Sequence, residues 1–459
     1  MMNIVIALLL VAVQFFTGMG MLGFFRVKMK PGLYFSLCVL LGVAVFSLVP
    51  FLLQLIMLPL TSTNIFLALL AACVWLNIHF KRNLEECRRM LRGSRFRIRA
   101  YEVPALLIIV AVVLISAWRC YYLPPTPRDL TSGAEVIAEY AVKEKTMINS
   151  VFTVNLETTN NQFKPPFITS LQIIYKDAGF PFGQIWLSTV FISFLAFLYH
   201  ALCRRIHGML AALLIVFFLA IPEMFAYTFM VLFDYSNAVF FFLSVYFLIE
   251  YFKIRKRDYI ALSGVLMGIA TYIRSETLIL AGLILPLLLW HHWRRKDAIR
   301  KILRAGIWFF LPSVVFYFLS ITLYFNFYLP VTYDVQGLVN TDLLNLQPIW
   351  QRWLAMNKRL IFSNDGIDYY AYFFFIFLLV LVADLFISPR LNRNARNWLY
   401  AILVVYLGMP ILGYLLPLLD IDNSTKRGLF RIFPLMLLYM GTSPAMARLS
   451  TRLRRWEKG

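Results

Sequence analysis

Residues 123–182 read LPPTPRDLTSGAEVIAEYAVKEKTMINSVFTVNLETTNNQFKPPFITSLQIIYKDAGFPF, the longest polar interval in a chain of 459 residues that is otherwise a series of apolar segments. A loop that only connects two membrane helices needs few residues, so a polar interval of this length indicates a working part rather than a connector. The interval contains an isolated acid, Asp129, and the sequence Lys164-Pro165-Pro166. We therefore interpret this loop as half of a functional site.

The composition predicts an all-α polytopic membrane protein. Hydrophobic residues make up 61% of the chain, aromatic residues 17%, and the mean hydropathy is +0.73. Soluble domains are only about half apolar. The net charge of +21 comes from short clusters of Lys and Arg between the apolar runs. This is the pattern that the positive-inside rule produces, so the charge indicates orientation and no nucleic-acid partner is expected.

A helix needs about 20 apolar residues to span a membrane. By this criterion the sequence predicts about thirteen transmembrane helices. They lie near residues 2–25, 32–57, 63–80, 103–122, 184–203, 209–228, 236–252, 259–273, 276–292, 305–327, 369–388, 398–418 and 429–447. An N-terminus on the outside makes every basic cluster cytoplasmic. Residues 1–100 then form an N-terminal block of three helices with a basic cytoplasmic segment, and residues 101–459 form the main module with outer loops 123–182, 328–368 and 419–428.

The polar chemistry is predicted to be extracytoplasmic, because the outer loops carry most of the acids that remain between the spans. Neither GxxxxGK[ST] nor GxGxxG occurs, and the outer side of a membrane has no ATP supply, so nucleotide hydrolysis is excluded as the primary function. A sugar or lipid handled on this side must arrive already activated on a membrane carrier. The five cysteines have no CxxC or metal spacing and indicate neither disulfides nor zinc.

Three acids of the first outer loop are candidate functional groups. Asp129 follows a proline-rich helix exit, where its carboxylate can reach a lipid phosphate and an attached sugar; the alternative is a cap on the helix expected at 133–146. Glu135 and Glu139 are four residues apart and share one face of that helix. They are candidates for helping Asp129 to bind a metal or orient an acceptor, and the alternative is a solvated helix surface.

Lys164 stands before two prolines that fix its turn, and a fixed cation at a membrane surface suits a phosphate. Arg431 lies in STKRGLFRIFP at the outer mouth of the last helix, against the positive-inside trend. It is a candidate for binding an anionic carrier. The alternative for Lys164 is an ordinary lysine at the membrane interface. The alternative for Arg431 is anchoring to the phosphates of the outer leaflet.

Charged residues also occur where two short apolar segments meet, within ATYIRSETLIL. Arg274 and Glu276 in this stretch are either a structural ion pair or, for Arg274, a second phosphate ligand, since charge at membrane depth usually faces a cavity or a partner. Asp234 opens another apolar segment, where it is either a helix cap or, like Glu276, a candidate for assisting the acceptor or a metal.

Five short motifs occur in a fixed order along the chain, and their combination is similar to that of a known family. They are PRD at 127–129, FKPPF at 163–167, LFDYSNAVFFF at 232–242, GVLMGIATYIRSETLIL at 264–280 and FRIFP at 430–434. Over residues 101–447 the chain resembles the class C (GT-C fold) glycosyltransferases. The similarity is to the aminoarabinose transferases, protein O-mannosyltransferases and bacterial relatives that use polyprenyl-phosphate sugars. The resemblance implies an inverting transfer to an acceptor hydroxyl without a covalent intermediate.

The resemblance also implies roles for individual residues. Asp129 would deprotonate or hold the acceptor, and Lys164 would hold the donor phosphate, with Arg274 and Arg431 as further phosphate ligands. A divalent cation, Mg²⁺ or Mn²⁺, is the only cofactor to consider. Many relatives have two adjacent acids where this chain has Asp129 alone, and some have an acid where it has Phe163, so a metal requirement is not implied.

The expected partners are a lipid-linked sugar donor, a glycan, lipid or protein acceptor, and the membrane. The expected location is the bacterial inner membrane, with the site facing the periplasm or exterior. Two other classes remain open: a transporter or flippase of a lipid-linked glycan, and a non-catalytic assembly protein with this fold.

Overall fold

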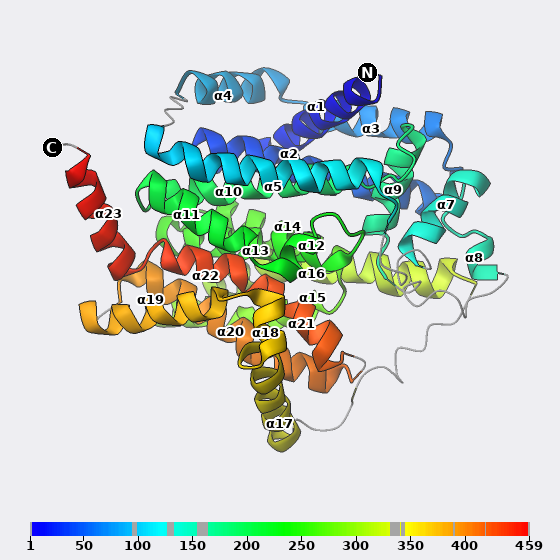
Figure 1. Ribbon diagram of the computed structural model, residues 1–459. Coiled ribbons are helices and arrows are strands. Elements are labelled where there is room, and N and C mark those ends of the chain that lie inside the picture. Colours follow the sequence, from blue (N-terminus) through cyan, green and yellow to red (C-terminus); the bar gives the residue numbers. More distant parts are fainter. Residues whose placement is uncertain are drawn as a thin grey trace.

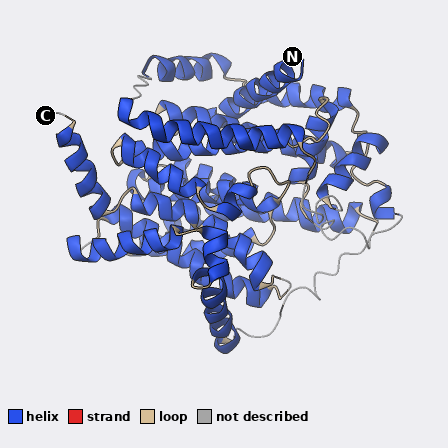
Figure 2. Cartoon of the chain, in the orientation of Figure 1, coloured by secondary structure: helices blue, strands red, loops and turns tan. Residues whose placement is uncertain are grey.

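The computed structural model describes residues 2–93, 99–125, 133–153, 164–330, 340, 345–388, 391–417 and 419–457. All secondary-structure elements in these ranges are helices (Figure 2). The predicted all-α class is therefore confirmed for the described part of the chain. Helices are the expected result for so apolar a sequence, because lipid offers no hydrogen bonds to an unpaired backbone.

The N-terminal helices are α1 (Met2–Gly23), α2 (Pro31–Leu55), α3 (Ser62–Leu76) and the amphipathic, basic α4 (Phe80–Gly93). Helices α1 and α2 pack directly on later helices. The Tyr272 hydroxyl donates a 3.0 Å hydrogen bond to the Ser47 carbonyl of α2. The Gln14 amide of α1 donates to the Tyr175 hydroxyl, also over 3.0 Å. The first three helices thus lie against the same core as the rest of the chain.

The central part of the chain runs from η1 to α16. In chain order its elements are η1 (Ala100–Glu102), α5 (Val103–Tyr122), α7 (Ala134–Glu144), α8 (Ser150–Thr153), α9 (Phe167–Asp177), α10 (Ile185–Cys203), α11 (Gly208–Leu219), α12 (Pro222–Ala226), α13 (Phe233–Ile254), α14 (Arg257–Ile273), α15 (Thr277–Trp293) and α16 (Ile299–Tyr317). Helix α10 packs against both α2 and α5, and the three run side by side (Figure 1).

The C-terminal part is more broken. Its elements are the π-helical η2 (Phe318–Tyr328), α17 (Leu346–Met356), η4 (Asn357–Ile361), α18 (Asn364–Tyr370), α19 (Phe373–Ile387), α20 (Arg393–Leu415), η5 (Ile421–Thr425), α21 (Lys426–Gly428), η6 (Leu429–Arg431), α22 (Phe433–Met440) and α23 (Pro444–Trp456). Helix α17 projects away from the packed body at the bottom of Figure 1.

In the described ranges, seven helices are long and apolar enough to cross a membrane, and up to ten spans result if each bent helix pair counts as one. The chain is therefore an integral membrane protein by its helices, and the predicted number of about thirteen spans is not confirmed. The predicted segments 63–80, 369–388 and 429–447 coincide with bends, of 80°, 91° and 51° between consecutive helices. The predicted segment 209–228 is not one helix. It is covered by two short helices, α11 and α12.

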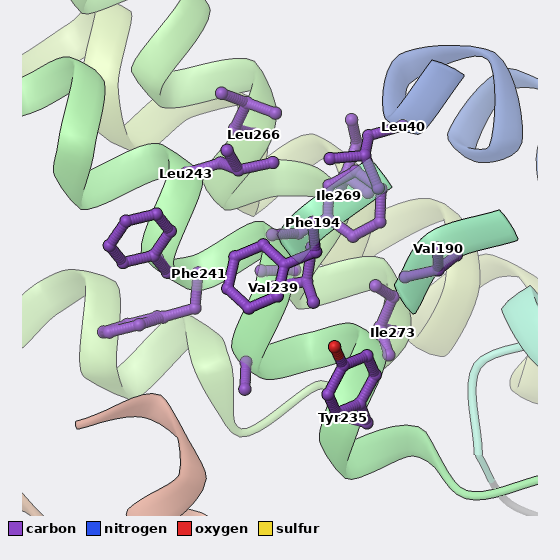
Figure 3. Packing of buried hydrophobic residues seen from close by; sticks show 14 of the residues in the cluster. Leu40, Val190, Phe194, Tyr235, Val239, Phe241, Leu243, Leu266, Ile269 and Ile273 are labelled. Atoms are coloured by element: carbon purple, nitrogen blue, oxygen red, sulfur yellow. The ribbon is translucent and has the colours of Figure 1, made fainter. Parts of the chain in front are cut away.

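Helix α13 forms the centre of the core. Every residue from Phe233 to Phe252 is buried, because α10, α14, α20 and η6 all pack around this helix. Figure 3 shows Phe194 of α10 beside Tyr235 and Val239 of α13, and Leu266 of α14 beside Leu243 of α13. A helix buried on all sides must be apolar all round, and between its two ends the sequence of α13 is apolar except for Ser244, whose hydroxyl donates to the Ser263 carbonyl. Those ends carry the sites described below.

Helices α1 and α2 approach closely at two glycines. A Cβ atom at Gly42 would meet the Gln14 carbonyl oxygen, and one at Gly18 would meet the Cys38 carbonyl oxygen. Both obstacles are backbone atoms, which cannot turn aside as a side chain does. Small residues at helix contacts are the usual means by which membrane helices pack closely.

We predict that Gly42→Ala destabilises the protein by about 1–3 kcal/mol, because the added methyl group forces α1 and α2 apart. Gly282→Ala in α15 is the matched control, because no atom lies within 4 Å of its Cβ position. Thermal unfolding of the detergent-purified variants measures the difference. Equal midpoints for the two variants would contradict the close approach.

Candidate functional site

Five of the eight predicted site residues gather near the first turn of α13. Asp234 lies in that first turn, Lys164 precedes α9, and Arg431 ends η6. Arg274 and Glu276 occupy the break between α14 and α15. The Lys164 ammonium interacts electrostatically with Asp234, Arg274 and Glu276. Segments far apart in the sequence thus converge at one end of the buried helix.

The break between α14 and α15 explains how two neighbouring charges face the same site. Arg274 has an extended backbone (φ −141°, ψ 115°), which ends α14. The Thr277 amide donates a 3.0 Å hydrogen bond to the Arg274 carbonyl, and α15 begins there. The tight turn keeps Arg274 and Glu276 together where the chain reverses.

Arg274 forms ion pairs with two carboxylates. Its Nη1 contacts Asp234 and its Nε contacts Glu276. All three residues are at most 7% exposed. Buried charges cost several kcal/mol each unless they are paired, so the mutual pairing is what allows them to lie here. The ion-pair alternative for Arg274 and Glu276 is therefore observed, and Asp234 is a third partner rather than an N-cap, since Leu232 occupies the cap position.

Arg431 completes the buried network. Its Nε donates a 2.5 Å hydrogen bond to Asn237 Oδ1, and its Nη2 lies 3.5 Å from Glu276 Oε1. The Asn237 amide nitrogen in turn donates to the Ala270 carbonyl (2.7 Å) and to Thr277 Oγ1 (2.9 Å). One neutral amide thus joins α13, α14, α15 and η6.

Asn237 and Arg427 belong to the site but were not among the predicted residues. Arg427 Nη1 lies 3.6 Å from Asp234 Oδ2. The sequence did contain a signal for Asn237, since it follows Asp234 by three residues and so shares its helix face. Arg427 stands four positions before Arg431 in consecutive helical turns, so the same spacing rule offered a signal for it.

The network carries more positive than negative charge. We call the following residues the charge cluster: Lys164, Asp234, Arg274, Glu276, Arg427 and Arg431. Its four cations face two carboxylates, an excess of two positive charges. Lys164 forms no ion pair with any residue in the described ranges, and burial, with Arg274 nearby, lowers the pKa of its ammonium. Such a cluster is suited to binding an anion.

Lys426, the next cation on the same segment, is already neutralised. Its ammonium lies 2.8 Å from a Glu223 carboxylate oxygen and 4.0 Å from the centre of the Tyr369 ring. The Tyr370 hydroxyl donates a 2.8 Å hydrogen bond to the Lys426 carbonyl. These contacts fix the segment that carries Arg427 against α12 and α18, so the position of the charge cluster is set from this side as well.

Glu135 and Glu139 have partners outside the charge cluster. Both pair with Lys176 of α9, at 2.6 Å and 3.0 Å, and the Gln172 amide donates a 2.5 Å hydrogen bond to Glu135. Burial raises the pKa of Glu135, against the effect of Lys176, whereas hydrogen bonds from Lys176 and Lys143 lower the pKa of Glu139. These acids fasten α7 to α9, and nothing in their contacts joins them to the charge cluster.

Asp129, the predicted catalytic residue, lies outside the described residues. Within the described ranges, no group of three or more metal-ligating side chains occurs. The two carboxylates of the charge cluster already contact arginines. The described residues therefore do not fit a bound divalent cation, and we derive no step from one.

No family model, no curated protein and no solved structure matches this chain.

We predict that Arg274→Gln destabilises the protein by about 3–5 kcal/mol, because it leaves the Asp234 and Glu276 carboxylates buried without their shared partner. Arg359→Gln is the control, since Arg359 and Asp422 form a pair in which both side chains are about 60% exposed. An exposed pair contributes at most about 1 kcal/mol. Thermal or chemical unfolding in detergent gives both values, and an equal loss in the two variants would refute the buried network.

Proposed function

We propose that the protein is an integral membrane glycosyltransferase that transfers a sugar from a polyprenyl-phosphate donor to an acceptor hydroxyl on the extracytoplasmic face. The observation that carries the proposal is the excess of positive charge in the charge cluster, with Lys164 left without an ion pair among the described residues. Lysine and arginine side chains are common ligands of phosphate groups in proteins. The resemblance of five sequence motifs to class C glycosyltransferases supports the same assignment.

In the proposed reaction the acceptor hydroxyl oxygen attacks the anomeric carbon on the face opposite the phosphate. The new C–O bond forms as the bond from the anomeric carbon to the phosphate oxygen breaks, and its electron pair stays with the departing polyprenyl phosphate. Asp129 accepts the hydroxyl proton. Lys164, Arg274 and Arg431 stabilise the charge that develops on the leaving phosphate, which is where preorganised cations contribute most.

An apolar cavity of about 190 Å³ offers room for part of the donor's lipid tail. It lies between α19, α20, η4 and α22 and is lined mostly by aromatic and aliphatic side chains, among them Phe377, Leu403 and Met436. Helix α22 begins two residues after Arg431. We place the first isoprenoid units here because their burial is favourable by about 25 cal/mol per Å².

We predict that the purified protein, given a lipid-linked sugar and an acceptor, releases free polyprenyl phosphate, and that Asp129→Asn slows this release by about 100-fold or more because the proton acceptor is lost. Asp422→Asn, which changes an acid in another outer loop, is the control and keeps full turnover. Equal turnover of the Asp129 variant would remove this residue from the reaction.

An assay with the protein in liposomes distinguishes the proposed glycosyltransferase from a flippase and from an assembly protein. Movement of the intact lipid-linked sugar between leaflets without sugar release would favour a flippase. Neither movement nor release with a panel of lipid-linked sugars would favour an assembly protein.

We predict that the affinity for polyprenyl phosphate falls as the pH rises from 7.5, because only the charged ammonium of Lys164 binds the anion. The pKa of Lys164 is lowered, so the loss occurs below the ordinary lysine pKa of 10.5. The phosphate itself, with a second pKa of about 6, stays ionised throughout. Fluorescence titration with a labelled polyprenyl phosphate measures the affinity at each pH.

Two variants check the assignment of this pH dependence. The Lys164→Arg variant should bind polyprenyl phosphate with the same affinity at every pH of the titration, because an arginine stays charged. Lys164→Gln should bind about 10–100-fold more weakly, which is the typical contribution of a charged hydrogen bond. Lys143→Gln, an exposed lysine of the same loop, should behave as the unsubstituted protein. An unchanged pH profile in Lys164→Arg would show that another group titrates.

A further inference from the structure

A second concentration of cations lies at the opposite end of α13. A cavity of about 250 Å³ is bounded there by the last turns of α13 and α15 and the first turns of α20. Phe252, near the end of α13, lines this cavity, whereas Asp234 at the beginning of the helix belongs to the charge cluster. Eighteen residues of helix separate the two, about 27 Å at 1.5 Å per residue. The cavity is therefore a separate site, on the face that the positive-inside rule predicts to be cytoplasmic.

The charged side chains that line this cavity are all cationic. Four arginines line it, Arg294, Arg295, Arg393 and Arg396, and no carboxylate does. None of the four forms an ion pair with a residue in the described ranges. The contrast with a neighbouring cavity of about 370 Å³ is informative, because there Asp297 pairs with His292 over 2.9 Å.

Two buried nitrogen atoms of the lining have no hydrogen-bond partner among the described residues. They are Nδ2 of Asn397, a residue only 8% exposed, and Nε2 of His291. The His291 ring is held in place by stacking on Phe252, with ring centres 4.1 Å apart. An amide NH₂ can only donate, and an imidazole nitrogen can do so. A buried donor without an acceptor costs about 1–3 kcal/mol, which a ligand with acceptor oxygens would remove.

The position of the cavity indicates where such a ligand comes from. Trp290 and Tyr400 line its edge, and Trp290 is 47% exposed. Tryptophan and tyrosine of this kind mark the depth of lipid head groups. Basic pockets between the ends of membrane helices are where anionic head groups bind.

We propose that this cavity binds the phosphate of an anionic phospholipid head group, with Arg393 and Arg396 as the principal cations and Asn397 as the buried donor. The proposal is independent of the reaction assigned to the charge cluster, because it uses none of its residues. It assigns to α20 a function at its first turns in addition to its packing against α15 and α22.

Binding of short-chain lipids to delipidated protein in detergent tests the proposal. Titration by native mass spectrometry should show dioctanoyl phosphatidylglycerol binding at least tenfold more tightly than dioctanoyl phosphatidylcholine. The double variant Arg393→Gln/Arg396→Gln should weaken phosphatidylglycerol binding about thirtyfold, since each basic residue near an anionic lipid contributes about fivefold. Arg300→Gln/Arg452→Gln, which changes exposed arginines outside both cavities, should bind as the unsubstituted protein.

Asn397→Asp provides a second variant of nearly unchanged volume. It places a carboxylate at the buried donor position and should abolish the preference for phosphatidylglycerol even if the double variant folds poorly. Equal binding of the two lipids, or unchanged binding in both variants, would overturn the site. Glycerol 1-phosphate that binds as tightly as phosphatidylglycerol would overturn the lipid source and assign the cavity to a soluble phosphate.

Discussion

The sharing of the Arg274 guanidinium between Asp234 and Glu276 is the interaction on which this end of the structure depends. Each of these charges is unfavourable when buried alone, and together they compensate one another. Arg431 joins the same arrangement through Glu276 and Asn237. As a consequence the start of α13, the break between α14 and α15, and η6 are held at one point. Apolar packing brings the helices together, but it is the pairing of charges that fixes which ends meet.

The sequence predicted the helical class and the long spans because both follow from composition. Predicted boundaries for the segments near 184–203 and 398–418 fall within a few residues of α10 and α20. The number of spans was less accessible, because mean hydropathy over a window does not register a bend. The segment 369–388, for example, is continuous in hydropathy, yet Ala371 has a positive φ of 49° and the chain turns there by 91°.

The predicted residues that the structure brings together are those whose charge is out of place in the sequence. Arg274 and Glu276 stand between apolar segments, and such residues nearly always meet other charges. The same reasoning does not single out Asn237, because a neutral amide has no charge to be out of place and its spacing from Asp234 is a weaker signal. Charge in the sequence also does not show which partner a residue has. Glu135 and Glu276 are both glutamates, but Glu135 pairs with Lys176, and only the folded arrangement of α7 and α9 shows this.

The two cationic sites differ in a way that suits different uses. In the charge cluster, two carboxylates offset part of the positive charge, so a bound anion meets attraction and repulsion together. A site that must release a phosphate after each reaction cycle needs this moderation, since tight binding of the product slows turnover. The cavity at the other end of α13 is lined by cations without carboxylates, which favours an anion that stays bound. On the functions proposed here, one end of α13 is arranged for exchange and the other for attachment to the membrane.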